Sequence, residues 1–138
     1  MQLDPRYDDV GREVIGHLRE RIARARAAGV PEDSIAVDPG IGFGKTARHN
    51  FEVLAGLEEL AMLGRPVLVG VSRKSFLGAP LDLPVDQRLE AGLAATAIAV
   101  FLGALIVRTH DVAATRRAVS IAARIRAARP RHEAHRPS

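Results

Sequence analysis

The sequence has no cysteine and no tryptophan, which excludes a disulfide framework and a thiolate metal site. Only 4% of its 138 residues are aromatic, so few side chains are present on which the bases of a nucleic acid could stack. The longest apolar run, residues 91–107, is interrupted by glycine and threonine and is shorter than the roughly 18 residues of a membrane span. No signal-peptide pattern begins the sequence. These absences favour a cytoplasmic protein that binds neither nucleic acid nor membrane.

The net charge of +4 is unevenly distributed along the chain. Seven arginines and a single acidic residue, Glu133, follow residue 115, so residues 1–115 carry a net charge of −2. The folded body is therefore not basic. A nucleic-acid binder, which would need a basic stripe and would lose affinity steeply with salt, is accordingly a weaker interpretation. We expect residues 129–138 to form a basic, disordered tail.

Hydrophobic periodicity predicts a helix followed by three strand–helix units. The first helix is capped by Asp8 or Asp9 and runs to about Ala28, with Gly29 positioned to end it. The predicted strands lie at residues 34–37, 66–71 and 105–109. The helices that follow them are predicted, in the same order, at residues 50–63, 85–102 and 112–128. Since strands joined by helices pair in parallel through right-handed crossovers, the fold class is α/β with parallel strands. The pattern alone does not distinguish an open sheet from part of a closed barrel.

Two of the predicted helices have distinctive surfaces. The helix at residues 85–102 is apolar around most of its circumference, which is typical of a helix buried against two neighbours or against another subunit. The helix at residues 112–128 is predicted to direct its apolar residues toward the core and its arginines toward solvent. The residues predicted to face the core are Val112, Val119, Ala122 and Ile125.

The segment DPGIGFGK at residues 38–45 invites two nucleotide-binding interpretations, neither of which fits. A phosphate-binding P-loop needs four residues between its first glycine and the Gly-Lys pair, but only three separate Gly40 from that pair. A dinucleotide fingerprint counted from Gly40 would need glycine at Lys45. One counted from Gly42 would need an acidic residue at the end of the next strand, where none occurs. The segment therefore predicts a different ligand.

Polar side chains follow all three predicted strands, at the position where α/β proteins keep their ligand sites. Asp38 can accept two parallel hydrogen bonds from the edge of an aminopyrimidinone ring, or it can simply cap its own loop. Residues 72–75 (SRKS) offer two cations and two hydroxyls to a carboxylate or phosphate, unless they are only solvated surface charge. Arg108 and His110 alternate after the third strand, so both can face one side and bind pyrophosphate, and Arg108 can also stack on a planar ring. A purely structural role for His110 is the alternative.

Taken together, these loops resemble the signature loops of the dihydropteroate synthase family, in the family's order. The matching segments are DPGIGFGK at residues 38–45, GVSRKSFLG at residues 70–78 and RTHDV at residues 108–112. The resemblance implies a TIM barrel that joins p-aminobenzoate to the pyrophosphate ester of hydroxymethyl-dihydropterin in folate biosynthesis, with release of pyrophosphate. It also implies a transferase that uses Mg²⁺ and forms a homodimer through its late helices.

The resemblance further implies which residues bind the substrates. Asp38 would hydrogen-bond the pterin ring, and Lys74 would contact both the pterin and the surroundings of the incoming amine. Ser75, at the start of its helix, would receive the carboxylate of p-aminobenzoate, and Phe43 would line that subsite.

Two residues after the third strand complete the implied site. Arg108 would stack over the pterin, and His110 together with Arg108 would hold the pyrophosphate. The family's reaction is an ionisation in which pyrophosphate leaves first, so the protein mainly stabilises charge and positions the amine. Lys74, Arg108 and His110 are therefore the predicted catalytic residues.

The resemblance covers only the last three βα units of a (β/α)₈ barrel, so residues 1–128 are expected to form a partial pterin-binding barrel domain. The early loops, including the asparagine that helps to hold Mg²⁺ and pyrophosphate, are missing from the match. We therefore expect a truncated or complementing part of the enzyme with little activity alone, and turnover at ordinary enzyme rates would contradict this. The alternative is a non-catalytic oligomerisation or interaction module derived from the same barrel, with residues 85–102 and the last helix as its interface.

Overall fold

Three short stretches of parallel strand lie at the centre of the computed structural model, which describes residues 9–130. β1 (Leu68–Val69) pairs with β2 (Ile106–Val107), so that the first residues of the two strands lie opposite each other. On the other side of β1, Val37 forms a single parallel bridge with Val67. The predicted α/β class with parallel strands is therefore confirmed, although the paired stretches are shorter than the predicted strands.

The helices begin and end where local chemistry favours a boundary. Asp9 accepts a hydrogen bond from the backbone N–H of Arg12 (3.1 Å) and caps the first helix, which ends shortly before Gly29 (φ +94°). This predicted helix is confirmed. The α-helices are α1 (Val10–Ala27), α2 (Ala47–Ala55), α3 (Leu57–Ala61), α4 (Ser75–Gly78), α5 (Leu89–Phe101) and α6 (Val112–Ala127). Short 3₁₀ turns form η1 (Glu32–Ser34), η2 (Ala79–Leu81) and η3 (Val85–Gln87).

Two predicted helices are wrong in detail. The helix predicted at residues 50–63 begins earlier, because Thr46 and His49 form a capping box that starts α2 at Ala47. It is also divided into α2 and α3 at Gly56, whose φ of −93° and ψ of 13° are not helical. The helix predicted at residues 85–102 starts only at Leu89, because the turn η3 occupies its first residues.

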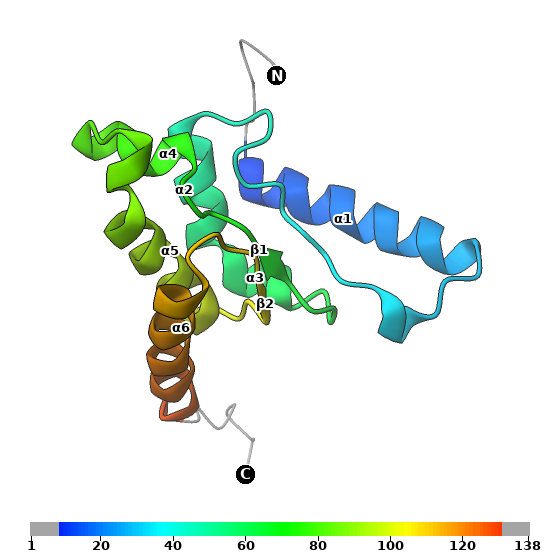
Figure 1. Ribbon diagram of the computed structural model, residues 1–138. Helices are drawn as coiled ribbons and strands as arrows, with labels where there is room; N and C mark the ends of the chain where they lie inside the picture. Colours follow the sequence, from blue (N-terminus) through cyan, green and yellow to red (C-terminus); the bar gives the residue numbers. More distant parts are fainter. Residues whose placement is uncertain (1–8, 131–138) are drawn as a thin grey trace.

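The hydrophobic core lies between the strands and the helices around them. Figure 1 shows α1 on one side of the strands and α5 with α6 on the other. Side chains that are almost completely buried include those of Ile41, Leu57, Val67 and Val69. Because the core holds the strands side by side, the loops that follow their carboxyl ends are brought to one edge of the molecule.

The last helix, α6, packs against α5 and leaves part of its apolar surface exposed. Ala122 is buried as predicted, but the side chains of Val112 and Ile125 are 65% and 56% exposed. Their predicted place in the core is therefore wrong. The reason is that α5 covers only one face of α6, whereas the prediction assumed a broader apolar contact.

The end of the described chain is attached to the body. Arg129, which we placed in the predicted tail, pairs with Glu58 (3.0 Å) and lies 4.7 Å from the ring centroid of Phe101. Residues 131–138 of the predicted tail lie outside the described residues. So do residues 1–8, and with them Asp8, the other predicted helix cap. Within residues 9–130, no helix is both long and apolar enough to cross a membrane.

Candidate functional site

A cavity of about 380 Å³ opens at the carboxyl ends of β1 and β2. Its lining comes from two loops, the one after β1 and the one after β2. The lining residues are Gly70, Ser72, Lys74, Arg108, Thr109 and His110. The structure thus brings together Lys74, Arg108 and His110, three of the residues predicted from separate segments of the sequence.

Arg108 lies against the backbone at the end of β1. A Cβ atom at Gly70 would be 3.2 Å from Nε of Arg108, so the absence of a side chain at Gly70 leaves the room that the guanidinium occupies. The next side chain, Thr109, has its hydroxyl 2.8 Å from that of Thr115 in α6. Arg108 therefore presents a planar cation to the cavity, while Thr109 fastens the strand end to the last helix.

Lys74 joins the cavity to the glycine-rich loop after Val37. Its Nζ donates a hydrogen bond to the carbonyl of Ile41 (2.6 Å) and lies 5.1 Å from the ring centroid of Phe43. Gly42 (φ +86°) allows this approach, because a Cβ there would be 3.1 Å from Cδ of Lys74. Burial lowers the pKa of Lys74, and the nearby cations Arg108 and Lys45 lower it further. The ammonium is therefore held in an environment suited to an added anion.

Asp38 lies beside this cavity and not among its lining residues. Its Oδ1 accepts a hydrogen bond from the backbone N–H of Gly40 (2.8 Å), so the carboxylate caps its own loop, as one of the two interpretations of the sequence expected. Its charge also raises the pKa of Lys74. Asp38 and Lys74 are therefore close enough to interact electrostatically, and capping the loop leaves the carboxylate exposed to solvent.

Two residues that the sequence analysis did not select hold the glycine-rich loop. The Nζ of Lys45 donates to the carbonyls of Gly40 (2.8 Å) and Phe43 (3.1 Å), and burial lowers the pKa of Lys45. Asn50, which is 2% exposed, accepts a hydrogen bond from the backbone N–H of Gly42 (2.8 Å). An asparagine on an otherwise apolar helix face could have indicated the contact between Asn50 and Gly42, because a buried amide needs a hydrogen-bond partner.

Ser75 and Phe43, the residues predicted for the p-aminobenzoate subsite, do not line the cavity. Ser75 is the first residue of the four-residue helix α4 and is exposed. The side chain of Phe43 is 66% exposed, with Lys74 as its charged neighbour. Both neighbour Lys74, which lines the cavity: Ser75 follows it in the chain, and the ring of Phe43 lies 5.1 Å from its Nζ.

Arg73, the second cation predicted after β1, is directed to another partner. It is a non-glycine residue with φ of +59°, and its guanidinium forms an ion pair with Asp111 (2.9 Å). The hydrogen bond between them raises the pKa of Arg73 and lowers the pKa of the Asp111 carboxyl. Arg73 therefore ties the loop after β1 to the loop after β2.

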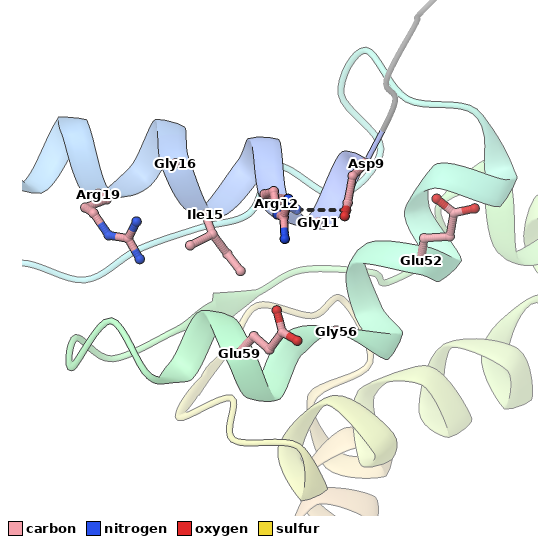
Figure 2. Close-up of a pocket in the computed structure, with 9 residues that line it drawn as sticks. All are labelled: Asp9, Gly11, Arg12, Ile15, Gly16, Arg19, Glu52, Gly56 and Glu59. Atoms are coloured by element: carbon pink, nitrogen blue, oxygen red, sulfur yellow. Dashed lines mark hydrogen bonds between the residues drawn. The ribbon is translucent and has the colours of Figure 1, made fainter.

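A second cavity, of about 680 Å³, lies between α1 and the helices α2 and α3 (Figure 2). Figure 2 shows Arg12 and Arg19 on α1 and Glu52 and Glu59 on the facing helices. Its charges are of both signs, and none of the predicted site residues lines it. It lies away from the carboxyl ends of the strands, so the smaller cavity is the candidate site.

The smaller cavity does not fit a resident magnesium ion. Mg²⁺ prefers oxygen ligands, above all carboxylates. The charged side chains that line this cavity are the cations Lys74 and Arg108. Across residues 9–130 no group of three His, Cys, Asp or Glu side chains could hold a metal. The lining is suited to an anion instead.

The fold and the cavity define an α/β protein with a cationic cavity at the carboxyl ends of its parallel strands. Residues 1–110 match the family described as pterin binding enzyme, and the chain belongs to this family. The resemblance to dihydropteroate synthases predicted from the three loops is also confirmed. The dihydropteroate synthase of Haemophilus influenzae is 46% identical over 115 residues, which make up 83% of this chain and 42% of the relative.

Solved structures agree with these relatives. The dihydropteroate synthase of Yersinia pestis in complex with a sulfonamide drug superposes with a TM-score of 0.88 at 41% identity, over 93% of this chain and 47% of that one. The synthase of Xanthomonas albilineans in complex with 7,8-dihydropteroate gives a TM-score of 0.86 at 42% identity, over 91% and 48%. The chain therefore spans less than half the length of each of these three relatives.

One relative shows that this degree of identity does not establish activity. A Mycobacterium leprae protein named inactive dihydropteroate synthase 2 is 43% identical to this chain over 118 residues, 86% of this chain and 40% of the relative. Similarity thus establishes the family, and the activity depends on the site.

Proposed function

We propose that this chain forms the part of a dihydropteroate synthase that binds the pterin pyrophosphate, and that it corresponds to the last three βα units of a (β/α)₈ barrel. The observation that carries the proposal is that Lys74, Arg108 and His110 line one cavity at the ends of two parallel strands. The chain also aligns over 91% of its length with the Xanthomonas albilineans synthase in complex with 7,8-dihydropteroate.

In the proposed reaction the amine of p-aminobenzoate replaces pyrophosphate on the methylene carbon of the pterin. The C–O bond breaks first and pyrophosphate leaves with the electron pair, after which the C–N bond forms and the amine loses a proton. Arg108 and His110 hold the leaving pyrophosphate, and Arg108 also stacks over the pterin ring. Lys74 contacts the pterin, with Phe43 and Ser75 nearby for the aminobenzoate. Arg108 and His110 lower the barrier by stabilising the negative charge that develops on the leaving pyrophosphate.

Magnesium has no assigned role among the described residues. The family resemblance implies Mg²⁺, but the cationic lining of the cavity does not fit it. The proposed roles of Lys74, Arg108 and His110 therefore depend on their own charges and hydrogen bonds.

The strands of the described structure leave an open edge of the kind that a closed barrel removes. At the start of β2, the side chains of Leu105, just before the strand, and of Ile106, its first residue, are 75% and 41% exposed. In a complete barrel each strand pairs on both sides and no edge remains. We accordingly keep the expectation that residues 1–138 alone turn over little substrate.

Asp38→Asn is the substitution that tests the pterin site. The amide oxygen of asparagine can still accept the hydrogen bond from Gly40, but the amide cannot accept two parallel hydrogen bonds from the pterin edge. We expect about a tenfold loss of pterin affinity, because one net hydrogen bond is worth about 1–1.5 kcal/mol. Isothermal titration calorimetry with a pterin measures it.

The control for this experiment is Asp33→Asn, the same chemical change in the exposed turn η1. This variant should bind the pterin as the unmodified chain does. Equal affinity of Asp38→Asn and the unmodified chain would assign Asp38 to loop capping alone. Failure of the unmodified chain to bind any pterin would refute the proposed function.

A second candidate function, the non-catalytic oligomerisation module, is favoured by an apolar groove of about 440 Å³ between α2, α4 and α5. Its lining includes Phe51, Leu77, Leu81 and Ile98, and the side chain of Ile98 is 56% exposed. We propose a second copy of the chain as its occupant, in line with the homodimer through late helices that the resemblance implies. The synthase proposal and the module share this surface and differ in pterin binding.

Ile98→Asp should convert a homodimer into a monomer, because it places a charge in the groove. Sedimentation velocity on the unmodified chain and the variant measures the change. Met62→Asp is the matched control, since Met62 is exposed at the end of α3 and does not line the groove. A dimer that survives Ile98→Asp would place the interface elsewhere, and a monomeric unmodified chain would exclude the dimer.

A further inference from the structure

One hydroxyl group joins the two loops that line the candidate site. Oγ of Ser72, after β1, lies 3.1 Å from the backbone nitrogen of His110 and 2.9 Å from Nδ1 of its ring. Both residues line the 380 Å³ cavity. Ser72 thus contacts the backbone and the side chain of His110 at the same time.

The hydrogen-bonding capacity of each group limits how these contacts are shared, and the Ser72 hydroxyl, with one proton and two lone pairs, can meet Nδ1 either as donor or as acceptor. The backbone N–H of His110 can only donate, so the oxygen of Ser72 accepts there. The hydroxyl proton of Ser72 then remains available to donate to Nδ1. Nδ1 can accept it only if the proton of the neutral ring is on the other nitrogen, Nε2.

We propose that Ser72 is a positioning residue that holds His110 in the tautomer with its proton on Nε2. Nε2–H is then the ring group available to the cavity, where it donates a hydrogen bond to an oxygen of pyrophosphate beside Arg108. In the opposite tautomer Nε2 would present a lone pair to the anion, which is repulsive. The identity of the anion rests on the proposed function, whereas the contacts between Ser72 and His110 do not depend on it.

A second tie keeps the two loops at the distance that this arrangement needs. The residues that follow Ser72 and His110, namely Arg73 and Asp111, form the ion pair of 2.9 Å already described. Arg88 adds a further support, since its Nη1 donates to the carbonyl of Arg73 (3.1 Å). The contact between Ser72 and His110 therefore belongs to a small network that joins the ends of β1 and β2.

The decisive measurement is the tautomer of His110 in the full 138-residue chain. Long-range ¹H–¹⁵N NMR spectra of ¹⁵N-histidine-labelled protein distinguish a protonated from an unprotonated ring nitrogen, and His110→Gln identifies the signal among the five histidines. We expect the Nε2–H form in the unmodified chain, a mixture in Ser72→Ala, and the Nε2–H form again in Ser72→Thr, which restores the hydroxyl. If Ser72→Ala does not fold, Ser72→Cys replaces it in this measurement, because the thiol is similar in size to the hydroxyl but is only a weak hydrogen-bond donor.

Calorimetry with inorganic pyrophosphate tests whether the contact between Ser72 and His110 contributes to anion binding. Ser72→Ala should bind pyrophosphate about three- to tenfold more weakly, the range expected for a partly misoriented hydrogen bond to an anion. Ser72→Thr should restore the affinity. Ser120→Ala, the same change on the exposed surface of α6, should leave it unchanged.

Each outcome decides between a positioning role and a structural tie. A tautomer that does not change in Ser72→Ala overturns the proposal. So does a changed tautomer with unchanged pyrophosphate affinity, or an unmodified chain that does not bind pyrophosphate. Pyrophosphate binding that depends on Ser72 in a chain that binds no pterin would uphold this inference while the proposed function fails.

Discussion

Replacing Gly78 with alanine should destabilise the chain by about 2–4 kcal/mol. A Cβ atom there would lie 2.5 Å from the carbonyl oxygen of Leu83 and 2.6 Å from Nε of Arg88, both closer than real contacts allow. The backbone of Gly78 itself suits alanine (φ −81°, ψ −22°), so the cost comes from crowding and not from strained dihedral angles. Overpacking of this kind costs about 1–3 kcal/mol, and displaced hydrogen bonds of Arg88 add about 1 kcal/mol.

The crowding at Gly78 cannot be relieved by moving one flexible side chain. The carbonyl that would be struck belongs to the backbone of Leu83, whose N–H donates to the carbonyl of Gly78 (3.0 Å). Arg88 is fixed by donating to the carbonyls of Leu83 (3.0 Å) and Arg73 (3.1 Å). The segment from η2 to the start of α5 would therefore have to shift as a unit, and with it the carbonyl next to Lys74.

Urea unfolding followed by circular dichroism measures this loss. Gly16→Ala is the matched control, because Gly16 lies inside α1 and a Cβ there would have nothing within 4 Å. That control should stabilise the chain by about 0.5–1 kcal/mol, the usual gain of alanine over glycine within a helix. Equal stability of Gly78→Ala and the unmodified chain would mean that the segment from η2 to α5 is not packed onto Gly78.

The sequence predicted those elements best whose boundaries depend on short-range chemistry. The first helix follows from Asp9 as its cap and from Gly29, which takes the positive φ that ends it. The division at Gly56 was missed, because a glycine within an apolar helical pattern does not reveal whether its backbone leaves the helix. The strands were predicted too long, because strand length depends on the neighbours with which the backbone pairs and not on the apolar run alone.

The candidate site likewise contains some residues whose position could be predicted from the sequence and others whose position could not. Lys74, Arg108 and His110 could be brought together from the sequence, because parallel strands place the residues after them at one edge. The direction of the Arg73 side chain could not be predicted from the sequence. Its backbone has a positive φ of +59°, which is rare outside glycine, and its guanidinium pairs with Asp111. The contact between Ser72 and His110 was likewise hidden, because it depends on the spacing of two loops far apart in sequence.

Lysine, and not arginine, supplies the cations that hold the glycine-rich loop. The sequence has only two lysines among its 20 basic residues, Lys45 and Lys74, and both donate to carbonyls of the glycine-rich loop. A compact ammonium can enter between loop carbonyls beside Gly42, whereas a planar guanidinium needs more room. Both lysines therefore act as fixed cations for the loop, but only Lys74 also lines the cavity.

Lys74→Met should weaken the binding of hydroxymethyl-dihydropterin pyrophosphate about 100-fold. The substitution removes a hydrogen bond to the ligand from a charged donor, worth about 1.5–3 kcal/mol. It also frees the carbonyl of Ile41, which lowers the stability of the loop. Lys45→Met frees the carbonyls of Gly40 and Phe43 in the same loop, which also lowers stability, but it removes no group that lines the cavity, so it should lower the affinity less than about tenfold. Calorimetry on both variants separates the two roles. Equal losses would show that Lys74 acts only by holding the loop, and the assignment of Lys74 to the ligand would then fail.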